Sequence, residues 1–181
     1  MISIGLDLSL AKTGIAILRD EDTVYTGLIK SKPSGESARA ETERLVGIVQ
    51  EIELTIAEHL GSEKPDIVVI EGLAFMARNT TALVQLAGLN YLVRAFLLAQ
   101  EWSFLIVAPS TLKKYVTGKG NSDKGVIILE VYKRWGESLL DDNIADAFGL
   151  AKIGEALLSP DIDTKLGKPQ QEVLKLLQPT L

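Results

Sequence analysis

Residues 2–9 read ISIGLDLS, and this stretch points to the fold class. Apolar side chains alternate with small or polar ones, and a period of two is typical of a β-strand with two different faces. One face carries Ile2, Ile4, Leu6 and Leu8, and the other carries Ser3, Gly5, Asp7 and Ser9. Because an acid without a role is costly in a central strand, Asp7 is the first candidate for a functional group.

The rest of the N-terminal third predicts two more strands and a helix. We expect strands at residues 2–8, 13–19 and 24–29, with the polar turn Asp20-Glu21-Asp22 joining the second to the third. Three consecutive strands with short connections form an antiparallel meander. Residues 36–60 then predict a long amphipathic helix, because apolar residues recur at helical spacing from Leu45 to Ile56.

The second half of the chain alternates strands with helices. Residues 66–70 read DIVVI, an apolar run that suits a parallel strand buried on both faces. We expect a helix at 79–100, a short helix that starts at Pro109, a helix that ends near residue 135 and a helix at 142–158. One more strand is expected at 103–107. Right-handed crossovers then give an α/β fold with a mixed five-stranded sheet, three antiparallel strands followed by two parallel ones, and helices on both faces.

The length of 181 residues suits one domain. We expect this domain at residues 1–158 and a C-terminal extension at 159–181, which Pro160, Pro169 and Pro179 punctuate. Residues 169–178 are compatible with a short helix that docks on the domain and equally with a tail that binds a partner.

The composition excludes several classes of site. The chain has no cysteine and one histidine, which removes disulfides, thiol nucleophiles and structural zinc and disfavours a Ser-His-Asp triad. The net charge of −5 means that a nucleic-acid partner would have to meet a local basic patch. We find no uninterrupted apolar run near the ~18 residues of a membrane span and no signal peptide, and therefore expect a soluble, cytoplasmic protein without membrane contact.

Three acids interrupt apolar stretches: Asp7, Glu71 and Asp146. Any one of them alone is as compatible with a structural carboxylate as with a catalytic one. Together, Asp7 and Glu71 would end neighbouring parallel strands, and a helix from Asp142 would bring Asp146 to the same edge. Clustered carboxylates repel unless cations lie between them, and such oxygen-rich sites suit Mg²⁺ or Mn²⁺. Two such ions ~3.5–4 Å apart can support phosphodiester hydrolysis.

Ordered motifs from residue 4 to residue 151 resemble the RuvC-type Holliday-junction resolvases of the RNase H-like (retroviral integrase) superfamily, particularly phage-like members. Residues 5–14 (GLDLSLAKTG) resemble the first-strand motif of that family, and residues 68–79 (VVIEGLAFMARN) resemble the second. Residues 113–118 (KKYVTG) through Lys124 keep the family's spacing of lysine and glycine, and residues 141–151 (DDNIADAFGLA) resemble the last motif.

The resemblance implies that Asp7, Glu71 and Asp146 bind metal. Family members commonly carry a further acid three residues before the last one, and here that position is Asn143. Asp142 lies four residues before Asp146, which is also one helical turn away, so we assign Asp142 as the fourth ligand. The amide oxygen of Asn143 is a weaker alternative. The resemblance implies two Mg²⁺ ions per active site, with Mn²⁺ as a possible substitute.

The resemblance also implies DNA-contacting residues. Lys113 and Lys124 would lie near the scissile phosphate, with Lys124 assisting catalysis, and Phe75 would stack on a base near the junction centre. Arg78, Lys113, Lys114, Lys119 and Lys124 could together form the local basic patch. The alternative for Phe75 is ordinary core packing, and the alternative for the lysines is solvated surface.

We therefore predict a homodimeric endonuclease that resolves four-way DNA junctions, with the predicted helix at 79–100 in the dimer interface. One alternative is an endonuclease of the same fold with broader activity on branched or flap DNA. Another is a non-catalytic junction-binding module, which Asn143 keeps open. An actin-like or sugar-kinase ATPase is disfavoured, because those folds clamp a nucleotide between two domains.

Overall fold

The computed structural model describes residues 1–33, 35–73, 80–159 and 166–178. The elements in chain order are β1 (Ile2–Asp7), β2 (Lys12–Arg19), β3 (Asp22–Lys30), α1 (Ala38–Leu60), β4 (Ile67–Glu71), α2 (Thr80–Ala99), β5 (Phe104–Val107), α3 (Pro109–Thr117), α4 (Lys124–Trp135), α5 (Asp142–Leu158) and α6 (Lys168–Leu177). All the strands and helices expected from the sequence are present, with ends that differ by at most two residues.

The five strands form one mixed sheet in the order β3-β2-β1-β4-β5. β1 is antiparallel to β2 and parallel to β4, which in turn is parallel to β5. The predicted α/β architecture is thereby confirmed. Because β1 and β4 are parallel neighbours, their carboxyl ends lie at the same edge of the sheet, which we call the carboxyl edge.

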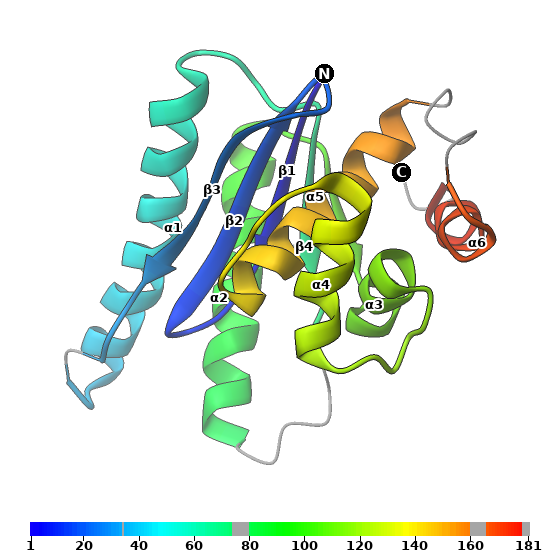
Figure 1. The fold of residues 1–181 in the computed structure, drawn as a ribbon. Helices are drawn as coiled ribbons and strands as arrows, with labels where there is room; N and C mark the ends of the chain where they lie inside the picture. The colour runs from blue at the N-terminus through cyan, green and yellow to red at the C-terminus, as the bar shows by residue number, and fades with distance from the viewer. Residues whose placement is uncertain (34, 74–79, 160–165, 179–181) are drawn as a thin grey trace.

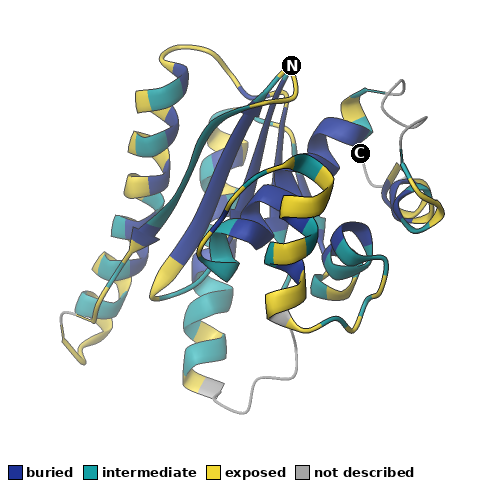
Figure 2. Ribbon diagram, viewed as in Figure 1, coloured by how far each residue is buried: buried dark blue, intermediate teal, exposed yellow. Residues whose placement is uncertain are grey.

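Helices cover both faces of the sheet (Figure 1). α1 and α2 pack on one face, where the apolar side of β1 contributes Ile2, Ile4 and Leu6. α5 packs on the other face, with α3, α4 and α6 outside it. Figure 2 shows the consequence, since most of β1, β2 and β4 and the inner sides of the helices are buried, whereas the edge strand β3 is mostly half-buried.

Local chemistry sets the ends of several elements. At the start of α1, the side chain of Ser37 accepts a hydrogen bond from the backbone N–H of Ala40, which satisfies one of the free donors of the first turn. The tight turn between β2 and β3 places Asp20 and Glu21 at φ values of 50° and 75°. The short polar side chain of aspartate tolerates this left-handed conformation. Positive φ at both turn positions matches the twist of the strands that the turn joins.

α6 is part of the helical layer that covers the α5 face. Its residues Val173, Leu174 and Leu177 are buried in the same core cluster as α3 and α5. Gln170 is also buried, and its side-chain amide donates a hydrogen bond to the backbone oxygen of Tyr115. Of the two alternatives for residues 169–178, the structure therefore shows the docked helix.

One helix in the described part of the chain is long and apolar enough to cross a membrane. Residues 81–99 of α2 have a mean hydropathy of 1.6. A single helix of this composition is weak evidence for a membrane span, because core helices of soluble proteins share it. Here Leu89, Val93 and Leu97 of α2 pack into the core beneath the sheet, which accounts for part of its apolar surface.

Candidate active site

Asp7 and Glu71 lie side by side at the carboxyl edge. The parallel register pairs Leu6 with Ile70, and Asp7 and Glu71 are the next residues of their strands. Side chains alternate along a strand, so Asp7 shares its face with Ser3, whose hydroxyl donates a hydrogen bond of 2.8 Å to the backbone oxygen of Ala151 in α5. Ile67 and Val69 belong to the core on the α5 side, and the same alternation carries Glu71 to that face.

Two glycines allow α5 to lie directly against the strands. A Cβ atom on Gly5 would lie 1.9 Å from the backbone oxygen of Ala147, and one on Gly14 would lie 2.0 Å from that of Asn143. Any side chain at these positions would push the helix away. Gly14 pairs with Asp7 across β1 and β2, so the first turn of α5 lies beside Asp7. The sequence motif contained both glycines, but their packing role was not predicted.

The start of α5 brings the remaining candidate ligands to this edge. Asp141 caps the helix by accepting a hydrogen bond of 2.9 Å from the backbone N–H of Asn143, and its other oxygen lies 3.5 Å from Nζ of Lys12. Asp142 and Asn143 occupy the first turn, and Asp146 follows one turn later. Asp7 and Asp146 are buried, whereas Glu71, Asp142 and Asn143 are half-buried. All five predicted metal ligands thus come from adjoining backbone positions.

The chemistry of these donors fits a hard divalent cation. Four carboxylates and one amide supply oxygen ligands, which Mg²⁺ and Mn²⁺ prefer. Within the described part of the chain, no group of three or more Asp, Glu or His side chains is already arranged as a metal site. The structure therefore supplies the backbone placement of the donors, and the ligand set remains a prediction.

The predicted basic residues divide into three groups. Lys113 is half-buried on α3, and Lys119 is exposed in the loop that follows. Lys114 instead forms an ion pair of 2.8 Å with Glu172 of α6, which lowers the pKa of that carboxyl. Phe75 and Arg78 lie outside the described residues, and so does the side chain of Lys124, whose backbone begins α4.

The loop that carries Lys119 is closed by its own hydrogen bonds. The hydroxyl of Thr117 accepts from the backbone N–H of Lys119 at 3.2 Å and lies 2.6 Å from the hydroxyl of Ser122. The hydroxyl of Ser122 also donates to the backbone oxygen of Lys119 at 3.0 Å. The loop therefore holds Lys119 by local contacts.

A cavity of about 380 Å³ adjoins Glu71 on the α2 side of the carboxyl edge. Its walls come from the β1–β2 connection, from residues 71–73 and from α2; they include Leu8, Leu10, Leu83, Leu86 and Asn90. Asn90 is fully buried, and its Nδ2 donates a long hydrogen bond of 3.5 Å to the backbone oxygen of Glu71. Sequence analysis missed Asn90, although a polar residue between Leu89 and Val93 of an apolar helix was a visible signal.

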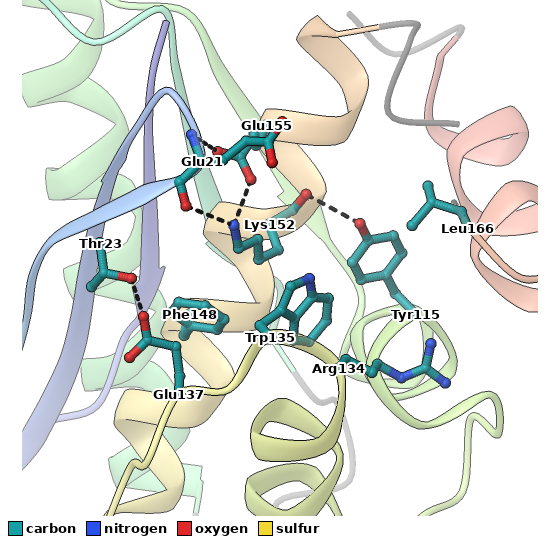
Figure 3. Close-up of a pocket in the computed structure, with 10 residues that line it drawn as sticks. All are labelled: Glu21, Thr23, Tyr115, Arg134, Trp135, Glu137, Phe148, Lys152, Glu155 and Leu166. Carbon is teal, nitrogen blue, oxygen red and sulfur yellow. Dashed lines mark hydrogen bonds and ion pairs between the residues drawn. The ribbon is translucent and has the colours of Figure 1, made fainter. Parts of the chain in front are cut away.

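A second cavity, of about 430 Å³, lies near the opposite end of the sheet (Figure 3). It is larger than the first but contains none of the predicted site residues. Nζ of Lys152 lies 2.8 Å from Oε2 of Glu155 in a buried ion pair, and Oε1 of Glu155 accepts a hydrogen bond of 2.9 Å from the backbone N–H of Glu21. The hydroxyl of Tyr115 donates to the backbone oxygen of Lys152 at 3.2 Å, and burial raises the pKa of this phenol.

Comparisons with known proteins identify the family of the chain. The family model of crossover junction endodeoxyribonuclease RuvC matches residues 3–152. The RuvC of Brachyspira hyodysenteriae is 26% identical over 155 residues, which cover 83% of this chain and 91% of the relative. That of Synechococcus is 27% identical over 163 residues, covering 83% of this chain and 96% of the relative.

Solved structures show the same fold. A structure of Thermus thermophilus RuvC in complex with Holliday junction substrate has a TM-score of 0.68 at 20% identity and covers 83% of this chain and 90% of that one. The yeast mitochondrial Holliday junction resolvase has a TM-score of 0.59 at 12% identity and covers 98% of this chain and 81% of that one. Because the family model spans most of the sequence and the fold agrees, this chain belongs to the RuvC family of crossover junction endodeoxyribonucleases.

Proposed function

We propose that the protein is an endonuclease that resolves four-way DNA junctions by metal-dependent hydrolysis of a phosphodiester bond. The observation that carries this proposal is the family match over residues 3–152. In addition, Asp7 ends β1, Glu71 ends β4 and Asp142 begins α5. These three elements meet at the carboxyl edge, where ligands of α/β proteins commonly bind.

In this proposal, Asp7, Glu71, Asp142 and Asp146 hold two Mg²⁺ ions, with Mn²⁺ as a substitute and Asn143 as an alternative ligand. When bound, such ions activate a water for attack on the phosphorus and stabilise the leaving oxygen. The burial of Asp7 and Asp146 supports this role, because carboxylates in a site with little water interact more strongly with a cation.

The basic residues of the proposal neutralise the DNA backbone. Lys113 and Lys119 lie on α3 and the loop after it, and Arg78 and Lys124 complete the proposed patch. Lys124 would stabilise the negative charge that develops on the scissile phosphate. Stacking on a base needs a flat aromatic group, and Phe75 is the proposed stacking residue.

A homodimer is the assembly that we propose. Val84, Tyr91 and Leu98 are 69%, 65% and 66% exposed and lie seven residues apart, so they form one apolar stripe along the outer side of α2. An exposed apolar stripe of this kind suits a second copy of the chain. Two-fold symmetry also matches a four-way junction that is cut in two equivalent strands. We place the activity in the cytoplasm of a bacterial or phage-infected cell, where such DNA lies.

The test is cleavage of a strand-labelled synthetic four-way junction by the wild type and by Asp7→Asn, with Mg²⁺, with Mn²⁺ and with EDTA. We expect paired cuts at symmetric positions that require metal. Asp7→Asn should lower the cleavage rate at least about 100-fold, because mutating even a residue that only hydrogen-bonds to a metal ligand costs about 10- to 100-fold in activity. Binding of the junction should be retained.

Other outcomes of this experiment separate the alternatives. Equal rates on junction, fork and linear duplex would contradict junction selectivity and favour a broader branched-DNA nuclease. Tight junction binding without cleavage in either metal would show a non-catalytic module. Near-normal turnover by Asp7→Asn would place the metal site elsewhere.

A further inference from the structure

Helix α6 lies outside the segment that the family model matches. The match ends at residue 152, whereas α6 covers Lys168–Leu177 and packs beside α3 (Figure 1). The side of α6 that faces the domain carries four buried residues, Gln170, Val173, Leu174 and Leu177. These contacts fix α6 to the domain, so its outer side is a surface that this chain adds to the matched segment.

The outer side of α6 presents two lysines. Lys168, Glu172 and Lys175 are exposed and follow one another at spacings of four and three residues, which places them on one stripe opposite the buried side. Lys168 lies in the first turn, where the helix dipole disfavours a positive charge and favours an anion. Helix stability therefore does not explain a lysine at this position.

The part of the protein formed by α3, the loop after it and α6, which we call the α3–α6 surface, is basic in an otherwise acidic chain. Residues 109–119 and 166–178 carry five lysines and one glutamate, whereas the net charge of the whole chain is −5. α1, on the opposite face of the sheet, carries five glutamates and two arginines. A polyanion is therefore attracted to the α3–α6 surface and repelled by α1.

The α3–α6 surface begins at the carboxyl edge. Glu71 pairs with Val107 at the end of β5, and α3 starts two residues later at Pro109. α6 is attached to α3, because the side-chain amide of Gln170 donates a hydrogen bond to the backbone oxygen of Tyr115. The lysines of α6 thus join the basic residues that the proposed function already places on DNA.

We propose that α6 extends the DNA-binding surface, with Lys114, Lys168 and Lys175 contacting backbone phosphates of one duplex arm of the junction. Lysine acts on phosphate as a point charge, and contacts to phosphates carry no sequence information directly. The contact is therefore independent of base sequence and of branching. This inference rests on the proposed function, which supplies the DNA, and adds to it an arm contact outside the segment shared with the family.

Glu172 holds the place of a phosphate in the protein without DNA. Its carboxylate forms an ion pair of 2.8 Å with Lys114, and the side chains of Glu172 and Lys114 are 47% and 40% exposed. The hydrogen bond from Lys114, with the charges of Lys168 and Lys175, lowers the pKa of Glu172, so this carboxyl stays charged. Because an exposed ion pair is weak, a DNA phosphate can replace the carboxylate on Lys114. Glu172 therefore competes with DNA for this lysine.

The experiment measures equilibrium binding of a labelled four-way junction, and of a linear duplex with the sequence of two of its arms, by fluorescence anisotropy in EDTA. Three variants are compared with the wild type: Lys168→Gln/Lys175→Gln, Glu172→Gln, and the control Lys64→Gln, which removes an exposed lysine from the connection between α1 and β4. Binding is measured over a range of KCl concentrations, because the slope of log Kd against log[KCl] reports the number of phosphate contacts.

The double lysine variant should bind both DNAs more weakly, and its slope should be smaller by about 2, or about 1 for each lost contact. Glu172→Gln should bind both DNAs more tightly, with a slope larger by up to about 1, because Lys114 is then free for a phosphate. Lys64→Gln should match the wild type. Single-turnover cleavage at saturating protein in Mg²⁺ should be unchanged in all three, because the arm contact acts on binding and not on the scissile phosphate.

A wild-type slope for the double lysine variant, or weaker binding by Glu172→Gln, would overturn the inference. A slope change with the junction but not with the duplex would also overturn it, because the lysines would then contact the branch point. If cleavage in Mg²⁺ persists in these cases, the proposed function stands. If the wild type cleaves no junction in Mg²⁺ or Mn²⁺, the proposed function fails, and the slopes alone decide whether α6 binds DNA. Thermal unfolding verifies that each variant is folded.

Discussion

Two cavities among the described residues, one beside Glu71 and one beside Lys152, differ in how their buried polar groups are satisfied. Near the end of α5, Lys152 and Glu155 form a buried ion pair that also makes hydrogen bonds to backbone groups of the β2–β3 turn. Beside Glu71, the buried oxygen of Asn90 has no partner among the described residues. Completed networks stabilise a fold, whereas a buried acceptor without a partner is unfavourable.

This difference teaches where to look for function. The larger cavity is lined by more polar residues, but its main polar side chains already have hydrogen-bond or ion-pair partners. The smaller cavity adjoins the edge at which β1, β4 and α5 meet. Volume alone does not identify a functional cavity, because it does not record whether the polar atoms that line the cavity already have partners.

The largest effect on stability should come from breaking the ion pair between Lys152 and Glu155. Lys152→Met leaves the buried carboxylate of Glu155 without its cation, which should lower the free energy of unfolding by about 3–5 kcal/mol. Lys133→Met is the matched control, because Lys133 forms an exposed pair with Glu130 at the same i, i+3 spacing on the chain, and its loss should be below about 1 kcal/mol. Urea unfolding measures both variants.

An unchanged free energy of unfolding for Lys152→Met would contradict the structural role of the second cavity. Replacing both partners, Lys152→Met with Glu155→Leu, should recover most of the lost stability, because no uncompensated charge then remains.

A second comparison uses two glycines where α5 contacts the sheet, Gly14 on β2 near the start of the helix and Gly154 on α5 itself near its end. Gly14→Ala and Gly154→Ala each add a Cβ atom that would lie 2.0 Å from the backbone oxygen of Asn143 and 2.3 Å from the hydroxyl of Ser3, respectively. Overpacking of this kind costs about 1–3 kcal/mol, measurable by urea unfolding. Only Gly14→Ala should also slow junction cleavage beyond its effect on the folded fraction, because it moves the turn that carries Asp142 and Asn143.

Equal cleavage rates for the two folded glycine variants would contradict the link between the start of α5 and the active site. A slower Gly154→Ala would instead show that the whole of α5, and not its first turn, sets the geometry at the carboxyl edge.

The smallest effect concerns pH. Burial raises the pKa of Tyr115 above its usual value of about 10, so the folded state keeps the phenol neutral where the unfolded chain releases its proton. The stability conferred by Tyr115 is thus complete below about pH 10 and falls as the pH rises further, by up to about 1.4 kcal/mol per pH unit. Tyr115→Phe should lose about 1 kcal/mol at pH 8 with its hydrogen bond, but should lack this alkaline decline.

Urea unfolding between pH 8 and pH 11 checks this prediction. Parallel curves for the wild type and Tyr115→Phe would mean that Tyr115 ionises normally and that the second cavity is open to water.

Most of the fold could be predicted from local sequence. The alternation in residues 2–9 and the continuous apolar run before Glu71 identified a two-faced strand and a doubly buried one, because side-chain periodicity reflects which faces are buried. The motifs also identified Asp7, Glu71 and Asp146 as candidates together. The docking of α6 could not be predicted, since an amphipathic segment does not reveal which surface it will cover.

By itself, the sequence determined the order of elements, the sheet arrangement and the family. Only the tertiary structure showed that Gly5 and Gly14 let α5 lie against the strands and that Lys114 is paired with Glu172. It also showed that Asn90 lies beside Glu71 and that its Oδ1 has no hydrogen-bond partner among the described residues. The physical reason is that periodicity and motifs are local properties of the chain. Close approach, ion pairing and hydrogen-bond satisfaction depend instead on which distant segments meet.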